Sequence, residues 1–130
     1  MNDETLLLRQ VHPSWVQGGV ISNQTFSSQT FTPMSKDKGL LSIFNGEKFS
    51  ALSAYEHYTQ SLQLVSVGVV AVTLGECKTI PINVLEDNEP FDGHCSIDFR
   101  LLTGSAIKRT ATTLKDYAKV RDWLYKAESK

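Results

Sequence analysis

The segment LVSVGVVAVTL, from Leu64 to Leu74, constrains the fold more than any other part of the chain. Its valines are β-branched and favour a strand, and the run is far shorter than the roughly twenty apolar residues of a membrane span. A strand with one face in water would alternate apolar and polar residues, and this one does not. The sequence therefore predicts a strand near 65–73 that is covered on both faces and lies centrally in a sheet.

Two main helices are expected to pack on one face of this sheet. The first covers about 50–63, with Ser50 as its N-cap, and the second covers about 104–128. The apolar stripes are Leu52, Tyr55 and Leu62 in the first helix, and Ile107, Ala111, Leu114 and Ala118 in the second. A further short helix is plausible over TLGECKT, directly after the central strand. Such stripes are typical of helices that bury one side.

Shorter extended segments complete the sheet. LLLRQVHP and LLSIF are expected to be strands, IPINV an edge segment because of Pro81, and VISNQTFSSQTFTP an irregular strand with a bend near Ser27. Strands and helices in this order predict a single α+β domain over 1–130, with a mixed, mostly antiparallel sheet. A chain of 130 residues has the size of one ordinary domain.

Charge and cysteine content limit the class of protein. The net charge is −1, which does not indicate general nucleic-acid binding. Residues 1–100 carry six basic and eleven acidic side chains, whereas 101–130 carry seven basic and three acidic ones. Two cysteines are too few for a disulfide-stapled scaffold, and no leader or membrane span is predicted. We therefore expect a soluble, cytoplasmic protein with reduced thiols.

The motifs of cofactor and metal sites are missing. The sequence has no GxGxxG, GxxxxGK[ST] or GxSxG segment, and its cysteines and histidines lack zinc-ligand spacing. We predict no metal and no cofactor. Cys77 would be reactive at a helix start, but a buried structural cysteine is the commoner case.

The segment FDGHCSIDF, residues 91–99, is the strongest candidate for chemistry. In a strand, Cys95, Ile97 and Phe99 would face the core, while His94, Ser96 and Asp98 would face the other side. Asp98 is too far along the strand to orient His94, and we expect it to pair with Arg100 if that side is covered. If that side is open, the catalytic candidates are His12, His94 and Ser96, because two histidines can act as base and acid without a metal.

A second set of residues suits partner binding. The candidates are Trp15, Lys115, Lys119, Trp123 and Tyr125, which combine aromatic anchors with a basic helix face. Ordinary solvation explains this basic face best. The same face also fits an acidic protein partner or, with weaker support, the phosphates of a nucleic acid. The absence of catalytic motifs favours a small protein-binding accessory or regulatory domain. The alternative is a small metal-independent hydrolase or nuclease, such as a toxin-type ribonuclease, that uses His12 and His94.

Overall fold

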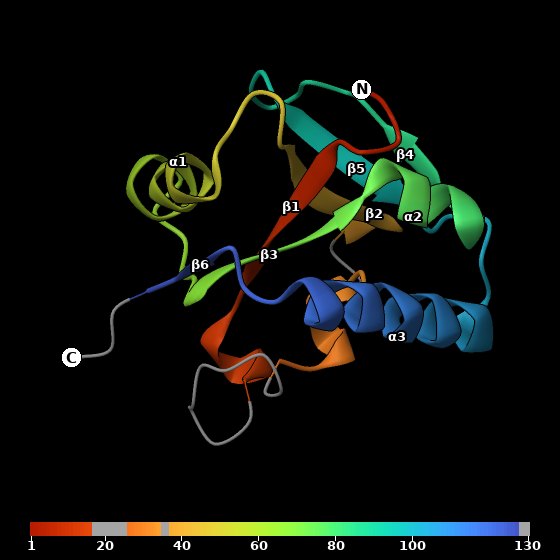
Figure 1. The fold of residues 1–130 in the computed structure, drawn as a ribbon. Coiled ribbons are helices and arrows are strands. Elements are labelled where there is room, and N and C mark those ends of the chain that lie inside the picture. Colours follow the sequence, from red (N-terminus) through yellow and green to blue (C-terminus); the bar gives the residue numbers. More distant parts are fainter. Residues whose placement is uncertain (17–25, 35–36, 128–130) are drawn as a thin grey trace.

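A computed structural model describes residues 1–16, 26–34 and 37–127 of the chain (Figure 1). The strands are β1 (Leu6–Val11), β2 (Leu40–Asn45), β3 (Gly68–Thr73), β4 (Asn83–Leu85), β5 (His94–Asp98) and β6 (Tyr125–Lys126). The α-helices are α1 (Ala51–Glu56), α2 (Leu74–Thr79) and α3 (Gly104–Arg121). Shorter helical turns are η1 (Pro13–Trp15), η3 (Ser28–Phe31) and the π-helical η5 (His57–Ser61). The predicted α+β class is confirmed.

The strands form one sheet in the order β4-β5-β2-β1-β3-β6, antiparallel throughout. β3 pairs with β1 along its whole length and with β6 at Gly68 and Val69. Its residues from Val69 to Val72 are fully buried, which confirms the prediction that both faces are covered. The strand begins at Gly68, three residues later than predicted. A Cβ at this glycine would collide with the ring of Trp123 and the carbonyl of Tyr125, so close packing explains the residue.

The helices cover opposite faces of the sheet, and the expectation that both pack on one face is wrong (Figure 1). The larger core lies between the sheet and α3, with Leu7, Leu41 and Ile97 among its strand residues. A smaller cluster around Leu8 and Phe44 lies on the side of α1. Both β1 and β2 carry apolar side chains on alternate faces, so the strands themselves call for a second covering layer.

Helix α3 buries the stripe that the sequence predicts. Ala111, Leu114 and Ala118 are at most 1% exposed. The helix ends at Arg121 rather than near 128, because Asp122 adopts a positive φ of 71° that a right-handed helix cannot contain. The chain then returns along β3 as β6. Arg121 donates to the Ala71 carbonyl at the uncovered edge of β3 and forms an ion pair with Glu76 of α2.

The first helix is shorter and differently oriented than predicted. Ser50 caps α1 through a capping box with Ser53, as its sequence position indicates. After Glu56 the hydrogen bonding becomes π-helical, and this shifts the helical phase. Leu52, before this change, is 48% exposed and Leu62, after it, is 37% exposed, so neither belongs to a buried stripe.

Other segments match the sequence prediction to different degrees. The helix over TLGECKT is present as α2, and the segment after Pro81 becomes the edge strand β4. The expected irregular strand over 20–33 falls partly outside the described residues. Within them, Phe26 forms an isolated bridge with Val16, and residues 28–31 form a helical turn capped by Ser27, so this part is not a strand.

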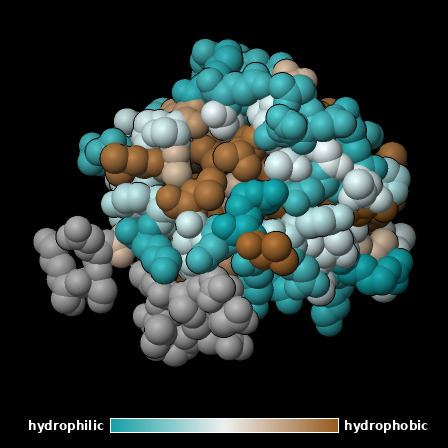
Figure 2. All heavy atoms as spheres, in the orientation of Figure 1, coloured by the Kyte–Doolittle hydropathy of each residue, from teal (hydrophilic) through white to brown (hydrophobic). Residues whose placement is uncertain are grey.

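The surface view shows how these layers are exposed. In Figure 2, hydrophobic residues gather between α1 and α3, in front of β1 and β3, and hydrophilic residues cover the upper rim. None of the helices in the described part of the chain is long and apolar enough to cross a membrane.

Candidate functional site

Helix α1 leaves part of its face of the sheet uncovered. It packs against β1, β3 and β6, at one end of the strand order, whereas β2 and β5 lie toward the other end. Side chains alternate along each strand, so Ser42 and Phe44 of β2 point to the same side as His94 and Ser96 of β5. The orientation predicted for the FDGHCSIDF strand is confirmed, since Cys95 lies in the core on the α3 side.

Three side chains on this face form a hydrogen-bonded chain. The Nδ1 atom of His94 lies 2.6 Å from Asp87 Oδ1, and its Nε2 atom lies 3.1 Å from Ser42 Oγ. A carboxylate can only accept, so Nδ1 carries a proton, and in the neutral form of the imidazole Nε2 is then the acceptor for the Ser42 hydroxyl. An acid, a histidine and a serine hydroxyl in this order have the connectivity of a Ser-His-Asp triad.

Strand register explains why these residues meet. His94 lies opposite Phe44, and Ser96 lies opposite Ser42, so His94 and Ser42 are diagonal neighbours across β5 and β2. Diagonal neighbours on one face are within reach of long and aromatic side chains. Asp87 lies two residues after Leu85, the β4 residue that pairs with Ser96. With a side-chain period of two residues, Asp87 therefore points to the same face as Leu85. All three side chains therefore lie on one face of the sheet, with Ser42 and His94 on adjacent strands and Asp87 in the loop after β4.

A fourth side chain holds the carboxylate. Ser96 is 2% exposed and donates to Asp87 Oδ2 over 2.8 Å, while His94 binds the other oxygen. Burial raises the pKa of Asp87, but the hydrogen bonds from His94 and Ser96 outweigh it and give a net lowering. Asp87 is therefore kept ionised, as a residue that orients a histidine must be.

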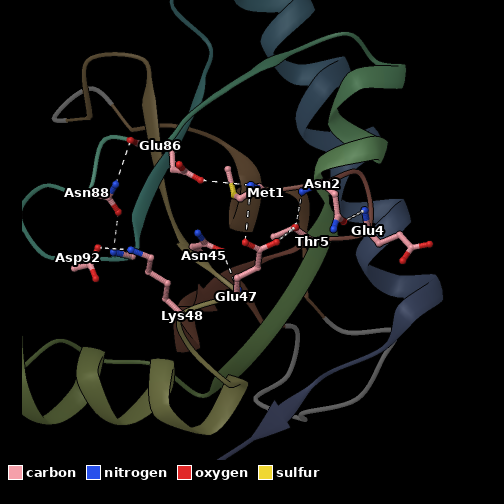
Figure 3. A network of polar contacts seen from close by, with 11 residues as sticks. Met1, Asn2, Glu4, Thr5, Asn45, Glu47, Lys48, Glu86, Asn88 and Asp92 are labelled. Carbon is pink, nitrogen blue, oxygen red and sulfur yellow. Dashed lines mark hydrogen bonds and ion pairs between the residues drawn. The ribbon is translucent and has the colours of Figure 1, made fainter.

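The β4–β5 loop, which carries Asp87, also contacts the N-terminus and the segment after β2. The Met1 amine lies 3.9 Å from a carboxylate oxygen of both Glu47 and Glu86, and the Lys48 amine donates to Asp92 over 2.6 Å. Figure 3 shows these residues gathered beside the β4–β5 loop. Within the loop, the Asn88 side chain accepts from the Gly93 backbone over 2.9 Å. These contacts join the β4–β5 loop to the N-terminus and to the segment after β2.

Gly93 sets the start of β5. Its φ is +96°, in the region that favours glycine, and a Cβ there would lie 2.6 Å from the ring of Phe49. The chain can therefore turn tightly just before His94 and bring the imidazole under the aromatic cluster of this face.

The triad opens into a pocket of about 340 Å³. Its lining is mostly apolar and comprises Ser42, Phe44, Tyr58, Leu62, Leu64, Pro90, Phe91 and His94. Phe91 packs edge-on against His94, with ring centroids 5.3 Å apart, and its ring centroid lies 4.4 Å from that of His57. The Nε2 atom of His57 is buried without a hydrogen-bond partner. The π-helical turn brings this ring inward.

Arg9 of β1 forms a hydrogen bond with the backbone of β2. Its Nη1 donates to the Ser42 carbonyl over 2.8 Å and its Nε donates to the Thr30 carbonyl over 2.7 Å. Burial lowers the pKa of Arg9 to about 10, with Tyr58 acting against this shift. The guanidinium lies 5.4 Å from the Trp15 ring. Arg9 thus fixes the backbone of the serine that bonds His94.

The structure does not bring His12 to His94. His12 is exposed after β1, where its Nδ1 contacts Ser14 and its ring lies 5.7 Å from Trp15. Both ring nitrogens of His94 are already occupied by Asp87 and Ser42. Among the described contacts none joins the two histidines. Of the three catalytic candidates, His94 and Ser96 lie in the network and His12 lies outside it.

The aromatic binding candidates are engaged inside the molecule. Trp123 is only 9% exposed and packs edge-on against Phe26, so little of its ring is accessible to a partner. Tyr125 belongs to β6 and packs on Tyr55, with ring centroids 4.7 Å apart. Trp15 is half-buried against Arg9. The early end of α3 sends this segment back over the sheet, which buries rings that a longer helix would have exposed.

The basic helix face is also less free than its sequence indicates. Lys115 is 3.3 Å from Asp116 and has a side chain 21% exposed. Lys119 lies 5.8 Å from the Phe26 ring centroid. The two lysines lie at the edge of the buried stripe of α3. This helix packs against η3 as well as against the sheet, so more than one of its sides is buried.

Neither metals nor thiols add to the site. No group of three or more histidine, cysteine, aspartate or glutamate side chains in the described residues could hold a metal ion. Burial raises the pKa of the Cys77 thiol to about 12 and that of Cys95 to about 11. Both cysteines are buried and unpaired by disulfides, which fits the structural role favoured for Cys77.

Asp98 takes the partner that the sequence predicts. Arg100 donates to both carboxylate oxygens of Asp98 over 2.9 Å. These bonds from Arg100 lower the pKa of Asp98. Asp98 is thus a structural anchor at the last residue of β5, where it binds Arg100.

Sequence reasoning missed Ser42 and Asp87. Ser42 is the single polar residue within LLSIF, and Asp87 is one of several acids in a loop. The polar residue in an apolar strand is a usable signal for Ser42, because it marks an alternation toward an open face. A comparison of the chain with family models, curated proteins and solved structures finds no match.

Proposed function

We propose that this chain is a metal-independent hydrolase of carboxylic esters or related acyl compounds, with Ser42 as nucleophile. The observation that carries the proposal is the chain of contacts from Asp87 through His94 to Ser42, with Ser42 and His94 on the wall of a pocket. The proposal retains the role of His94 as base from the sequence analysis and replaces His12 by a serine.

The reaction follows from the tautomer of His94. The Ser42 oxygen attacks the substrate carbonyl carbon while its proton passes to His94 Nε2, and the ester bond then breaks as that proton passes to the leaving alcohol. Water attacks the acyl–Ser42 ester, again giving a proton to Nε2. The carboxylic acid departs, the proton returns to Ser42, and one ester plus one water give one acid and one alcohol.

Asp87 and Ser96 orient the base. The Asp87 carboxylate keeps the Nδ1 proton in place and stabilises the imidazolium that forms when Ser42 loses its proton. Ser96 occupies the second carboxylate oxygen, so that the carboxylate cannot rotate away from His94. We assign Ser96 to a positioning role, since it does not line the pocket.

Labelling with a fluorophosphonate tests the nucleophile directly. An activated serine forms a stable phosphonate ester, which peptide mass spectrometry locates. We expect the label on Ser42, its loss in Ser42→Ala, and at least tenfold slower labelling in His94→Gln, because the base is gone. Ser105→Ala is the matched control, since Ser105 is exposed at the start of α3. Unlabelled protein, or a label that persists in Ser42→Ala, would overturn the proposal.

A protein-binding accessory role is the second candidate. It is favoured by three exposed apolar side chains after η5, namely Leu62, Leu64 and Val65, which are 37%, 48% and 58% exposed. An exposed apolar run of this kind fits an apolar partner surface better than the acidic or phosphate-bearing partners suggested by the lysines of α3. A chain that resists labelling but captures a partner lost on Val65→Asp would support this candidate instead.

A further inference from the structure

We propose that the pocket beside Ser42 receives the acyl part of an uncharged substrate with an apolar chain, and that Leu64 and Leu62 set the preferred chain length. This inference rests on the proposed hydrolase function and adds the class of substrate to it.

The composition of the wall is the first argument. Phe44 and Phe91 form aromatic contacts along one side, with ring centroids 5.2 Å apart, and Pro90 and the two leucines add aliphatic surface. The polar atoms on the wall are the hydroxyls of Ser42 and Tyr58 and the imidazole of His94. A mostly apolar wall with a few convergent polar groups is typical of small-molecule sites. Two of the polar groups here, Ser42 and His94, are the residues that would react with the ester.

Charge is the second argument. None of the pocket-lining residues carries a permanent charge. Asp87 lies behind His94 with 32% of its side chain exposed, so it would repel a substrate carboxylate. Arg9 already donates to the Thr30 and Ser42 carbonyls. A neutral acyl chain therefore fits the site better than a dicarboxylic monoester or a phosphodiester.

The leucines at the rim are the third argument. Leu62 and Leu64 follow η5 and line the pocket, although they are 37% and 48% exposed. An apolar chain lying in the pocket would cover these side chains and remove apolar surface from water. Transfer of one methylene group from water contributes about 0.8 kcal/mol, which corresponds to about fourfold in kcat/KM. Leu52 offers a control, because it is 48% exposed on α1 without lining the pocket.

The test is a series of p-nitrophenyl esters: acetate, butyrate, hexanoate and the anionic monosuccinate. We expect kcat/KM to rise about fourfold per added methylene until the pocket is filled, and the monosuccinate to be at least tenfold poorer than butyrate. In Leu64→Ala the gain in kcat/KM from acetate to hexanoate should shrink relative to the parent. Leu52→Ala should behave as the parent.

Two results would overturn the inference. One is a kcat/KM that does not depend on chain length, and the other is an equal response of Leu64→Ala and Leu52→Ala. If either occurs while fluorophosphonate still labels Ser42, the substrate class is wrong and the hydrolase function stands. If Ser42 is not labelled and no ester is hydrolysed, both the function and the inference fail.

Discussion

His57 shows how one side chain can work against the stability of its surroundings. Its ring packs among Phe44, Phe49 and Phe91, and its Nε2 is buried without a partner. A buried polar group without a hydrogen bond costs about 1–3 kcal/mol. The π-helical turn that begins at this residue brings the ring into the cluster, and π-helical turns are frequent at functional sites.

Replacing His57 with Phe should therefore stabilise the protein. The variant removes the unpaired nitrogen and keeps a flat ring, so we expect a gain of about 1 kcal/mol in the free energy of unfolding. For a domain of this size this corresponds to a rise in melting temperature of about 3–5 °C. Thermal unfolding measures it, with His57→Asn as control because an amide would still be buried unpaired. A melting temperature below that of the parent would mean that the imidazole has a partner.

Asp87 makes stability depend on pH. Hydrogen bonds from His94 and Ser96 outweigh burial and lower its pKa, so the folded state binds this proton less tightly than the unfolded state. The contribution is then fully present above the unfolded pKa of about 3.9 and is lost as pH falls through the lower folded value. Asp87→Asn should thus be less stable than the parent at pH 7.

Urea unfolding at pH 7 and at pH 3 measures this effect. The difference in the free energy of unfolding between the parent and Asp87→Asn should narrow at pH 3. This pH lies below the unfolded pKa of about 3.9, so protonation of the unfolded chain removes part of the parent's advantage. Asp92→Asn serves as control, because its ion pair with Lys48 is solvent-exposed and such pairs contribute little. A difference between the parent and Asp87→Asn that is the same at both pH values would show that the charge of Asp87 is not what holds the network.

At the scale of elements, α3 is the main cover of the larger core. Leu114 is fully buried at the centre of its stripe, so Leu114→Ala should lower the free energy of unfolding by about 2–5 kcal/mol. Lys108 is exposed on the same helix, and Lys108→Ala should change stability by less than about 0.5 kcal/mol. Denaturant titration of both variants provides the comparison. Equal losses would mean that the helix does not pack through this stripe.

The elements also show what a single sequence can predict. Alternation placed His94 and Ser96 on the face opposite Cys95, and this is correct because the side-chain period of a strand is two residues. The partners of His94 were not predictable in the same way. Ser42 reaches it diagonally from another strand, and Asp87 reaches it from a loop, so both contacts depend on the register between strands. Register is a property of pairing that no local pattern specifies.

The C-terminal segment illustrates a different limit. The helical period continues past Arg121, so the sequence favoured a helix to 128 that would expose Trp123 and Tyr125. The positive φ at Asp122 ends the helix, and pairing with β3 outweighs the local preference. The sequence feature that indicates this contact between β3 and β6 is Gly68. A side chain at this position would prevent β6 and Trp123 from approaching so closely.

At the scale of the molecule, the site results from unequal covering of the two faces. The face toward α3 holds a continuous core, whereas α1 packs on β1, β3 and β6 of the other face. The polar triad and its pocket occupy the remaining surface over β2 and β5. Rigid strands thus present Ser42 and His94, and the loop after β4 supplies Asp87.

The most direct measurement of the central claim is hydrolysis of p-nitrophenyl hexanoate by Ser42→Ala, His94→Gln and the double variant. Residues that act as one catalytic unit give losses that do not add. We predict a loss of at least a hundredfold in kcat for each single variant and no further loss in the double variant, with melting temperatures showing that all three are folded. Full activity in Ser42→Ala, or losses that multiply in the double variant, would contradict the assignment of Ser42 and His94 to one catalytic unit.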